Sequence, residues 1–277
     1  MIIIADSGST KTDWCIGSTK TDHQVVQTSG INPFHQSAGE IGKVIAHTLV
    51  PQMGDTTEIT AIYFYGAGCT PEKSEIVKQA LQLSFPQAEI SVESDLLGAA
   101  HALCGHDTGI ACILGTGSNS CAYDGTKITN QVSPLGYILG DEGSGAVLGK
   151  RFISDCLKHQ LPDDLTRQFL KEYELTSAQI LDKVYRQPLA NRFLASLTPF
   201  LSAHKDVAEI HALLLSCFTD FFQRNVMHYS PGNSLVHFTG SIAYYFQEEV
   251  REAANRLNIK TGKIIKSPME GLIDYHL

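Results

Sequence analysis

The chain has 277 residues, of which 43% are hydrophobic and 18% are charged, and its formal net charge is −8. These values exclude a disordered chain, and the acidic balance excludes a global basic surface for nucleic acid. No apolar run approaches the ~20 residues of a membrane span, and the apolar residues before Asp6 are too few for the core of a signal peptide. We therefore expect a cytoplasmic protein that binds neither nucleic acid nor membrane.

Strands and helices alternate along the first third of the chain. The apolar run 2–5 predicts a buried strand, because it ends at Asp6 and a glycine turn. By the same criteria, further strands are expected at residues 11–16, 25–28, 59–65 and 90–92, and helices at residues 38–49, 71–85 and 96–103. Three strands and a helix are thus followed by two pairs of a strand and a helix.

The same order of elements restarts after Gly109. Strands are expected at residues 110–114, 121–123, 127–129, 235–238 and 263–265, and helices at residues 144–157, 244–257 and 268–276. Two copies of one pattern predict two stacked α/β domains, 1–108 and 109–277, with a cleft between them. The second domain is expected to carry a helical insertion at about 162–229.

The helical insertion contains large apolar residues that need a place to be buried. They include Phe193, Leu197, Phe218 and Phe222. Two interpretations remain open at this point. The residues form the interface of a homodimer, or they complete the core of the second domain.

The seven cysteines include no C-x-x-C pair. Zinc sites and disulfide scaffolds need closer spacing, so neither is expected. Reduced cysteines in the interior of a cytosolic protein are the expectation that remains.

Three glycine turns each follow a predicted strand. They span residues 6–12, 115–119 and 239–243. Backbone N–H groups and hydroxyls of such turns can bind phosphate oxygens, although a single turn is more often an ordinary surface turn. Their corresponding places in two similar halves favour a nucleotide site. Other nucleotide signatures fail: no G-x-G-x-x-G follows a strand, and the segment 144–151 lacks both ends of a P-loop.

Carboxylates stand where two predicted strands end. Asp6 closes the first strand, Asp95 closes the last strand of the first half, and Asp141 lies in the Gly-Asp-Glu-Gly-Ser segment 140–144. Strand ends of α/β sheets face the ligand crevice, and a carboxylate suits both a general base and a holder of hydrated magnesium. Asp95 and the segment 140–144 each also precede a predicted helix, so helix capping remains an alternative for both.

These segments together resemble the BadF/BadG/BcrA/BcrD-type ATPases, which include N-acetylglucosamine kinase and belong to the actin-like superfamily. Residues 6–13 and 115–119 resemble the two phosphate loops of the family, and residues 239–243 stand where its adenosine loop should be. Residues 140–144 are similar to its sugar-side segment, and residues 94–100 to the segment with the catalytic aspartate. The resemblance covers about residues 2–275, with all five segments in order.

The resemblance implies an α/β protein of two ribonuclease H-like, actin-like ATPase domains with the active site in the cleft between them. It implies an ATP- and Mg²⁺-dependent phosphotransferase that acts on an alcohol group of a sugar. The nucleotide-binding residues implied are Asp6, Gly8, Thr10, Lys11, Thr116, Gly117, Gly240 and Ser241, with Asp6 holding Mg²⁺ through water. The sugar-binding residues implied are Asn32, Asp95, Ser118, Asn119, Gly136 and Asp141, with Asp95 as the general base.

Three questions stay open at the level of sequence. The first is whether the acceptor is N-acetylglucosamine, glucosamine or another hexose. Other members of the family are ATPases that activate a partner enzyme through an iron–sulfur cluster, for which Cys104 and Cys112 are the nearest cysteines. A non-catalytic nucleotide-binding sugar sensor is the third alternative.

Overall fold

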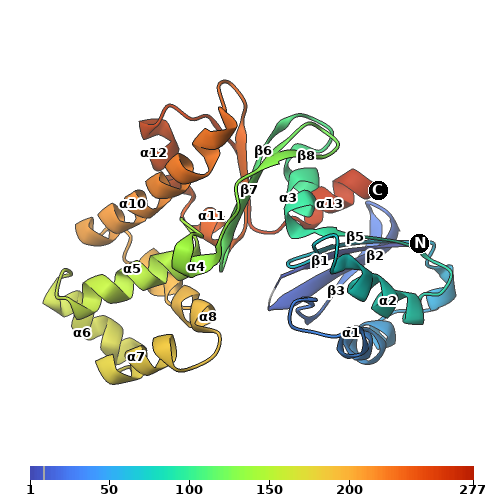
Figure 1. Ribbon diagram of the computed structural model, residues 1–277, viewed down its shortest axis with the longest axis horizontal. Coiled ribbons are helices and arrows are strands. Elements are labelled where there is room, and N and C mark those ends of the chain that lie inside the picture. Colours follow the sequence, from blue (N-terminus) through green and yellow to red (C-terminus); the bar gives the residue numbers. More distant parts are fainter. Residues whose placement is uncertain (9) are drawn as a thin grey trace. The chain divides into compact units, whose positions relative to one another are not determined.

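The structure is a computed structural model that describes residues 1–8 and 10–277. Residue contacts divide the chain into two compact units (Figure 1). Unit 1 comprises Met1–Thr108, Tyr123–Ile128 and Ser267–Leu277, and unit 2 comprises Gly109–Ala122 and Thr129–Lys266. The two later segments of unit 1 differ from the expected single division after residue 108. The C-terminal segment belongs to unit 1 because its helix packs on a helix of that unit.

Unit 1 is built on a five-stranded sheet. Its strands are β1 (Ile2–Ser7), β2 (Lys11–Thr19), β3 (Asp22–Ser29), β4 (Ala61–Gly66) and β5 (Glu89–Ser94). The strand order is β3-β2-β1-β4-β5. The strands β1, β2 and β3 form an antiparallel meander, whereas β1, β4 and β5 run parallel.

The second sheet repeats the order of the first. Its strands are β6 (Gly109–Leu114), β7 (Ser118–Tyr123), β8 (Ile128–Gln131), β9 (Val236–Thr239) and β10 (Thr261–Ile265). Their order is β10-β9-β6-β7-β8, so each strand corresponds to the strand numbered five lower in the first sheet. The repeated α/β half predicted from the sequence is therefore confirmed.

Helices cover both faces of the unit 1 sheet. They are α1 (Ala38–Val44), α2 (Ser74–Ser84), α3 (Asp95–Cys104) and α13 (Met269–His276). Residues of α1 and α2 are buried against Ile3, Trp14 and Phe64 on one face. Residues of α3 and α13 are buried with Ile4 and Tyr65 on the other. This alternation along β1 follows from the period of two in a strand.

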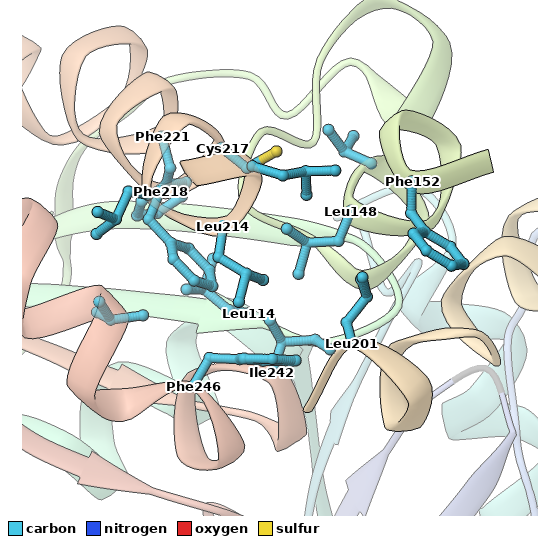
Figure 2. Close-up of a cluster of buried hydrophobic side chains, with 14 of the residues drawn as sticks. Leu114, Leu148, Phe152, Leu201, Leu214, Cys217, Phe218, Phe221, Ile242 and Phe246 are labelled. Carbon is cyan, nitrogen blue, oxygen red and sulfur yellow. The ribbon is translucent and has the colours of Figure 1, made fainter. Parts of the chain in front are cut away.

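Unit 2 has a larger helical part. Its helices are α4 (Gly136–Leu139), α5 (Gly145–Leu157), α6 (Asp163–Glu172), α7 (Ser177–Tyr185), α8 (Ala190–Ala195), α9 (Thr198–Ala203), α10 (Ala208–Arg224), α11 (Ser241–Tyr245) and α12 (Gln247–Arg256). Figure 2 shows side chains of α5, α10 and α11 meeting Leu114 of β6 in one apolar core. The insertion expected at about 162–229 corresponds to α6–α10 and a 3₁₀ turn at Val226–Tyr229.

The apolar residues of the insertion belong to the core of their own unit. Leu197, Phe218 and Phe222 are fully buried in it, and Phe193 packs against it. Of the two interpretations, the second is therefore the one that the structure supports. These residues give no argument for a homodimer, which stays a prediction.

Two long predicted helices are each interrupted. The segment 38–49 is α1 followed by a π-helical turn at Ile45–Leu49, and the segment 244–257 is divided by Phe246 between α11 and α12. All seven cysteines are buried, as expected. Within the described part of the chain, no helix is long and apolar enough to cross a membrane.

Candidate functional site

In unit 1, four strands align a row of polar side chains near the end of β1. Asp6 lies in register with Asp13 on β2 and with Tyr65 on β4, and Tyr65 lies in register with Glu93 on β5. Residues in register on neighbouring strands project from the same face of a sheet. For this row it is the face that carries Tyr65 and is covered by α3 and α13. The row gathers three carboxylates on one face.

The Asp6 carboxyl group is strongly perturbed. Burial raises its pKa to about 7, and the charges of Asp95 and Asp13 raise it further while Lys11 opposes them. Lys11 itself pairs with Asp13 at 2.8 Å, and the Gln27 side chain donates a hydrogen bond to Asp13 at 2.7 Å. Asp13 is therefore compensated by its neighbours, whereas the protein disfavours the ionised form of Asp6.

Asp95 is the first residue of α3, but it is not the residue that caps this helix. The N-cap is Ser94, whose hydroxyl accepts a hydrogen bond from the Leu97 amide at 3.2 Å. Burial raises the pKa of Asp95 to about 6, although the amides of Leu96 and Asp95 itself lower it. The sequence left open whether Asp95 only caps this helix, and the structure shows that Ser94 is the cap. The carboxylate of Asp95 remains available for chemistry.

The first glycine turn connects β1 and β2 beside this row. The Gly8 amide donates to the Lys11 carbonyl at 3.0 Å, and Gly8 and Thr10 are exposed on the turn. Beneath it, the buried Ser7 and Thr12 hydroxyls lie 2.7 Å apart and fix the two strands. The turn also contains Ser9, which lies outside the described residues. Exposed Gly8 and Thr10 can meet phosphate oxygens without any change of the core.

Asn32 organises a loop near Asp95. Its side-chain oxygen accepts a hydrogen bond from the Phe34 amide at 2.9 Å, so its amide group is the part that could donate to a ligand. The loop after β4 touches Asn32 at Gly68, where a Cβ would lie 2.4 Å from the Asn32 Oδ1 atom. One residue further, burial and then the charge of Asp95 raise the pKa of the Cys69 thiol. This loop therefore brings Asn32 and Asp95 into one neighbourhood.

In unit 2, the second glycine turn is held by the start of α5. The amides of Gly145 and Ala146 donate to the carbonyls of Gly115 and Thr116 at 2.8 and 3.1 Å. The α5 helix is capped by Ser144, whose hydroxyl accepts from the Val147 amide at 3.2 Å. The turn thus has a fixed backbone, with Thr116 partly exposed on it.

Asp141 reaches this turn from the segment 140–144. It has a positive φ of 52°, and a Cβ on Gly117 would lie 3.0 Å from its Oδ2 atom. Burial raises the pKa of Asp141 to about 6, the Ser118 amide lowers it by donating a hydrogen bond, and Glu142 raises it. The cap of α5 is Ser144, so Asp141 is not required for capping. The glycine at 117 gives the carboxylate its room.

The other predicted sugar-side residues of unit 2 are Ser118, Asn119 and Gly136, and they differ in burial and in the hydrogen bonds that they already make. Ser118 is buried and contributes its amide to Asp141. Asn119 is partly exposed, but its side-chain oxygen already accepts from the Ser120 amide at 3.0 Å and from Gln131 at 3.2 Å. Gly136 begins the short helix α4, where its carbonyl accepts from the Gly140 amide at 2.7 Å. Its contribution to a site would be through its backbone.

The third glycine turn adjoins the second. Gly240 has a φ of 111°, and a Cβ there would lie 2.3 Å from the Leu114 carbonyl oxygen, so only glycine fits. Ser241 follows as the exposed first residue of α11. Ile242 lies 3.2 Å from the position of a Cβ on Gly145, at the start of α5. Unit 2 therefore brings together the turns at 115–117 and 240–241.

Sequence reasoning did not single out Tyr65 and Glu93. Both belong to the row that contains Asp6, and they are recognised only through strand register. The period-two pattern of each strand shows which residues share a face, but not which residue of the next strand lies opposite. The carboxylate of Glu93 adds to the negative charge there, since it contributes to raising the pKa of Tyr65 after burial and Tyr275.

The residues of unit 1 fit a hydrated cation beside Asp6. The charges of Asp95 and Asp13 oppose the ionisation of Asp6, and a cation would offset this effect. Across residues 1–8 and 10–277, no group of three or more His, Cys, Asp and Glu residues could hold a metal ion directly. Carboxylates that contact a cation only through its bound waters suit Mg²⁺, which keeps several of its waters when it is bound by protein carboxylates.

Among known proteins, the chain is similar to solved structures of sugar-kinase type. No protein-family model and no curated protein matches the chain. The crystal structure of the "Putative N-acetylglucosamine Kinase" of Porphyromonas gingivalis is 50% identical, with a TM-score of 0.97, and the match covers 100% of this chain and 98% of that chain. A protein of the same description from Chromobacterium violaceum is 19% identical, with a TM-score of 0.78 over 99% and 98% of the two chains. A ROK family glucokinase from Streptomyces griseus, in complex with glucose and AMPPNP, is 14% identical, with a TM-score of 0.60 over 99% and 97%.

The two similar sheets, their flanking helices and these matches define a two-domain fold of the sugar-kinase type. Within this class, the chain belongs to the same family as the Porphyromonas protein, because half of the residues are identical over nearly the whole of both chains.

Proposed function

We propose that the chain is an ATP-dependent kinase that phosphorylates a hydroxyl group of N-acetylglucosamine or a related amino sugar. The observation that carries this proposal is the state of Asp95: a carboxylate at the end of β5, with its pKa raised to about 6 by burial and its helix capped by Ser94. A general base works best when its pKa lies near the working pH. The identity to the Porphyromonas protein supports the choice of an amino sugar.

In this proposal, Asp95 accepts the proton of the attacking hydroxyl group. At neutral pH a carboxyl group with a pKa near 6 is mostly ionised, and it is a stronger base than an ordinary aspartate. The Asn32 amide, in the same neighbourhood, donates a hydrogen bond that orients the sugar. Positioning of this kind supplies most of the catalysis in phosphoryl transfer.

Asp141 is proposed to hold the sugar from unit 2. Its carboxylate accepts hydrogen bonds from sugar hydroxyls, and the Ser118 amide fixes its direction. Glu142 anchors the same segment, because it pairs with Arg224 at 2.9 Å and accepts from Asn225 at 3.3 Å. A rigid support of this kind is what a binding carboxylate needs to discriminate between sugars.

The glycine turns are proposed to bind the nucleotide. Gly8, Thr10 and Lys11 in unit 1 and Thr116 and Gly117 in unit 2 offer backbone amides, hydroxyls and one ammonium group to phosphate oxygens. Gly240 and Ser241 lie where adenosine is expected. A hydrated Mg²⁺ ion near Asp6 would offset the charge of the phosphates and of the carboxylate row.

The test is a measurement of ADP formation from ATP and Mg²⁺ with N-acetylglucosamine, glucosamine, glucose or no sugar. We expect ADP to form only with sugar, fastest with an amino sugar, and a sugar phosphate to appear in the ³¹P NMR spectrum. Rapid ATP hydrolysis that no sugar changes would contradict the proposal and favour an ATPase that activates a partner. Binding of sugar and ATP without turnover would favour a sensor.

A further inference from the structure

Tyr65 lies between the strand of Asp6 and the helix of Asp95. It is in register with Asp6 across β1 and β4, and its ring packs against Gly98, one helical turn after Asp95. A Cβ on Gly98 would lie 2.8 Å from the Cβ and Cγ atoms of Tyr65, so a side chain there would push α3 away from the ring. The ring of Tyr65 therefore sets the spacing between α3 and the sheet.

The hydroxyl group of Tyr65 is held by two histidines. It lies 2.9 Å from the Nδ1 atom of His101 and 2.8 Å from the Nε2 atom of His276. A hydroxyl has a single hydrogen, so it donates to one imidazole and accepts from the other. His101 belongs to α3 and His276 to α13, and the hydroxyl thus ties both helices to β4. These three residues are called the Tyr65–His101–His276 triad below.

Aromatic rings fix both imidazoles of the triad. Tyr275 stacks on His101 with 4.0 Å between ring centroids and an angle of 9° between the planes. Tyr63 stacks on His276 at 4.0 Å and 21°. Burial lowers the pKa of His101 and of His276 to about 4, so both rings are neutral near pH 7. Each ring is therefore kept in one place without a charge.

The C-terminal helix approaches α3 very closely. A Cβ on Gly271 would lie 2.3 Å from the Ala102 carbonyl oxygen. Met269 and Leu272 of α13 are buried in the cluster that contains Tyr65. Figure 1 shows α13 beside α3. Within this packing, the hydrogen bond between Tyr65 and His276 joins residues that are 211 positions apart in the sequence. None of these contacts of α13 involves a residue that is proposed to touch a substrate.

We propose that Tyr65 and His276 are positioning residues of the kinase reaction. The triad fixes α3 on the sheet and thereby fixes Asp95, at the start of α3, relative to Asp6 on β1. The inference rests on the proposed function, because it concerns where the general base stands. It predicts that α13 controls the rate of phosphoryl transfer without touching either substrate.

The test compares four single variants. Tyr65→Phe removes the hydroxyl and keeps the ring, and His276→Phe removes the nitrogen and keeps a ring that can stack on Tyr63. His276→Gln keeps a polar nitrogen and loses the ring. The matched control is Tyr63→Phe, which keeps the ring on which His276 stacks. For each variant, kcat, both KM values, the melting temperature and hydrogen exchange of the α3 and α2 amides are measured.

We expect Tyr65→Phe and His276→Phe each to lower kcat by roughly ten- to a hundredfold, because small displacements of a catalytic group have effects of this size. KM for ATP should stay within about twofold, since the glycine turns are untouched. A double variant with both Tyr65→Phe and His276→Phe should lose little more activity than the poorer of these two single variants, because both changes break one unit. His276→Gln should retain more activity than His276→Phe. Exchange should become faster in α3 and stay unchanged in α2.

Either of two kinetic results would overturn the inference. One is an unchanged kcat in Tyr65→Phe and His276→Phe together with a lower melting temperature, which is the signature of a purely structural role. The other is equal kcat in His276→Phe and His276→Gln, and this comparison decides the matter if Tyr65→Phe does not fold. A parent that phosphorylates no sugar contradicts the proposed function instead. Hydrogen exchange then decides alone, and unchanged α3 protection in the variants overturns the inference.

Discussion

Asp6 and Asp13 face each other directly across the antiparallel pair of β1 and β2. Like charges at opposite positions of such a pair destabilise a sheet. Lys11 and Gln27 compensate Asp13, but the pKa of Asp6 is still raised to about 7, first by burial and then by Asp95 and Asp13. The protein alone therefore disfavours the ionised form of Asp6, which a bound cation would favour.

The first prediction concerns stability and pH in the absence of ligands. The pKa of Asp6 is raised from 3.8 to about 7, so the folded state holds its proton more tightly than the unfolded state does. The resulting loss of stability is absent below about pH 4 and complete above about pH 7. The amide of Asp6→Asn cannot ionise. The free energy of unfolding of this variant, relative to that of the parent, should therefore increase as pH rises. One pKa unit corresponds to about 1.4 kcal/mol, and we expect a total gain of roughly 2–4 kcal/mol.

Chemical denaturation of both proteins between pH 4.5 and 8 measures this difference. The comparison with the variant is needed because the stability of the parent alone also depends on other groups. Burial lowers the pKa values of His101 and His276 to about 4, so both proteins lose stability as the pH falls below the pKa of an ordinary histidine. A stability difference between Asp6→Asn and the parent that is constant over this range would contradict the assignment.

The second prediction concerns the two threonines of the phosphate turns. Thr10→Ala and Thr116→Ala should each raise KM for ATP by roughly ten- to a hundredfold, because each removes one hydrogen bond to a charged oxygen. The melting temperature should hardly change, since Thr10 is exposed and Thr116 is partly exposed. The matched control is Thr21→Ala, an exposed threonine of the turn between β2 and β3. Normal ATP kinetics in both turn variants would remove these residues from the site.

Local sequence signals predicted the strands that carry the glycine turns. The apolar runs before Asp6 and Gly115 correspond to β1 and β6, because such runs ended by glycine have few other folded forms. The end of a helix was harder to predict. Residues 38–49 keep apolar spacing throughout, yet the α-helix ends at Val44 and continues as a π-helical turn. Apolar spacing does not distinguish two helical forms that bury the same face.

The candidate site could be predicted from the sequence only in part, for a similar reason. Asp6, Asp95 and Asp141 could be proposed because each stands at a strand end or before a helix, which are local features. Tyr65 and Glu93 join Asp6 only through the register of β4 and β5, and His276 joins Tyr65 across 211 positions. Such pairings depend on how distant strands and helices pack, and a single sequence contains no local sign of them.

The third prediction concerns the room that Gly117 gives to Asp141. A methyl group there would lie 3.0 Å from the Asp141 Oδ2 atom, so the carboxylate must shift by a few tenths of an ångström. Gly117→Ala should therefore raise KM for the sugar, by roughly three- to tenfold, since a displaced hydrogen-bonding group loses part of its binding energy. The matched control is Gly115→Ala, because no described atom lies within 4 Å of a Cβ at that position. Equal sugar KM values in both variants would contradict the role of Asp141.

The last prediction separates catalysis from capping at the start of α3. Asp95→Asn should lower kcat by roughly 10²–10⁴-fold, the usual contribution of a positioned base, because an amide cannot accept the hydroxyl proton. Its melting temperature should not fall, since Ser94 caps the helix. Ser94→Ala should show the reverse pattern, with a loss of about 1 kcal/mol of stability and a kcat much closer to that of the parent.

The pH dependence of turnover provides the decisive comparison for Asp95. The base must be ionised to accept a proton, and burial raises its pKa to about 6. The kcat of the parent should therefore fall below about pH 6 and level off above it. Ser94→Ala should keep this acidic limb, whereas the residual activity of Asp95→Asn should lose it. An acidic limb that persists unchanged in Asp95→Asn would assign the proton transfer to another group, and a rate equal to that of the parent would remove Asp95 from the chemistry altogether.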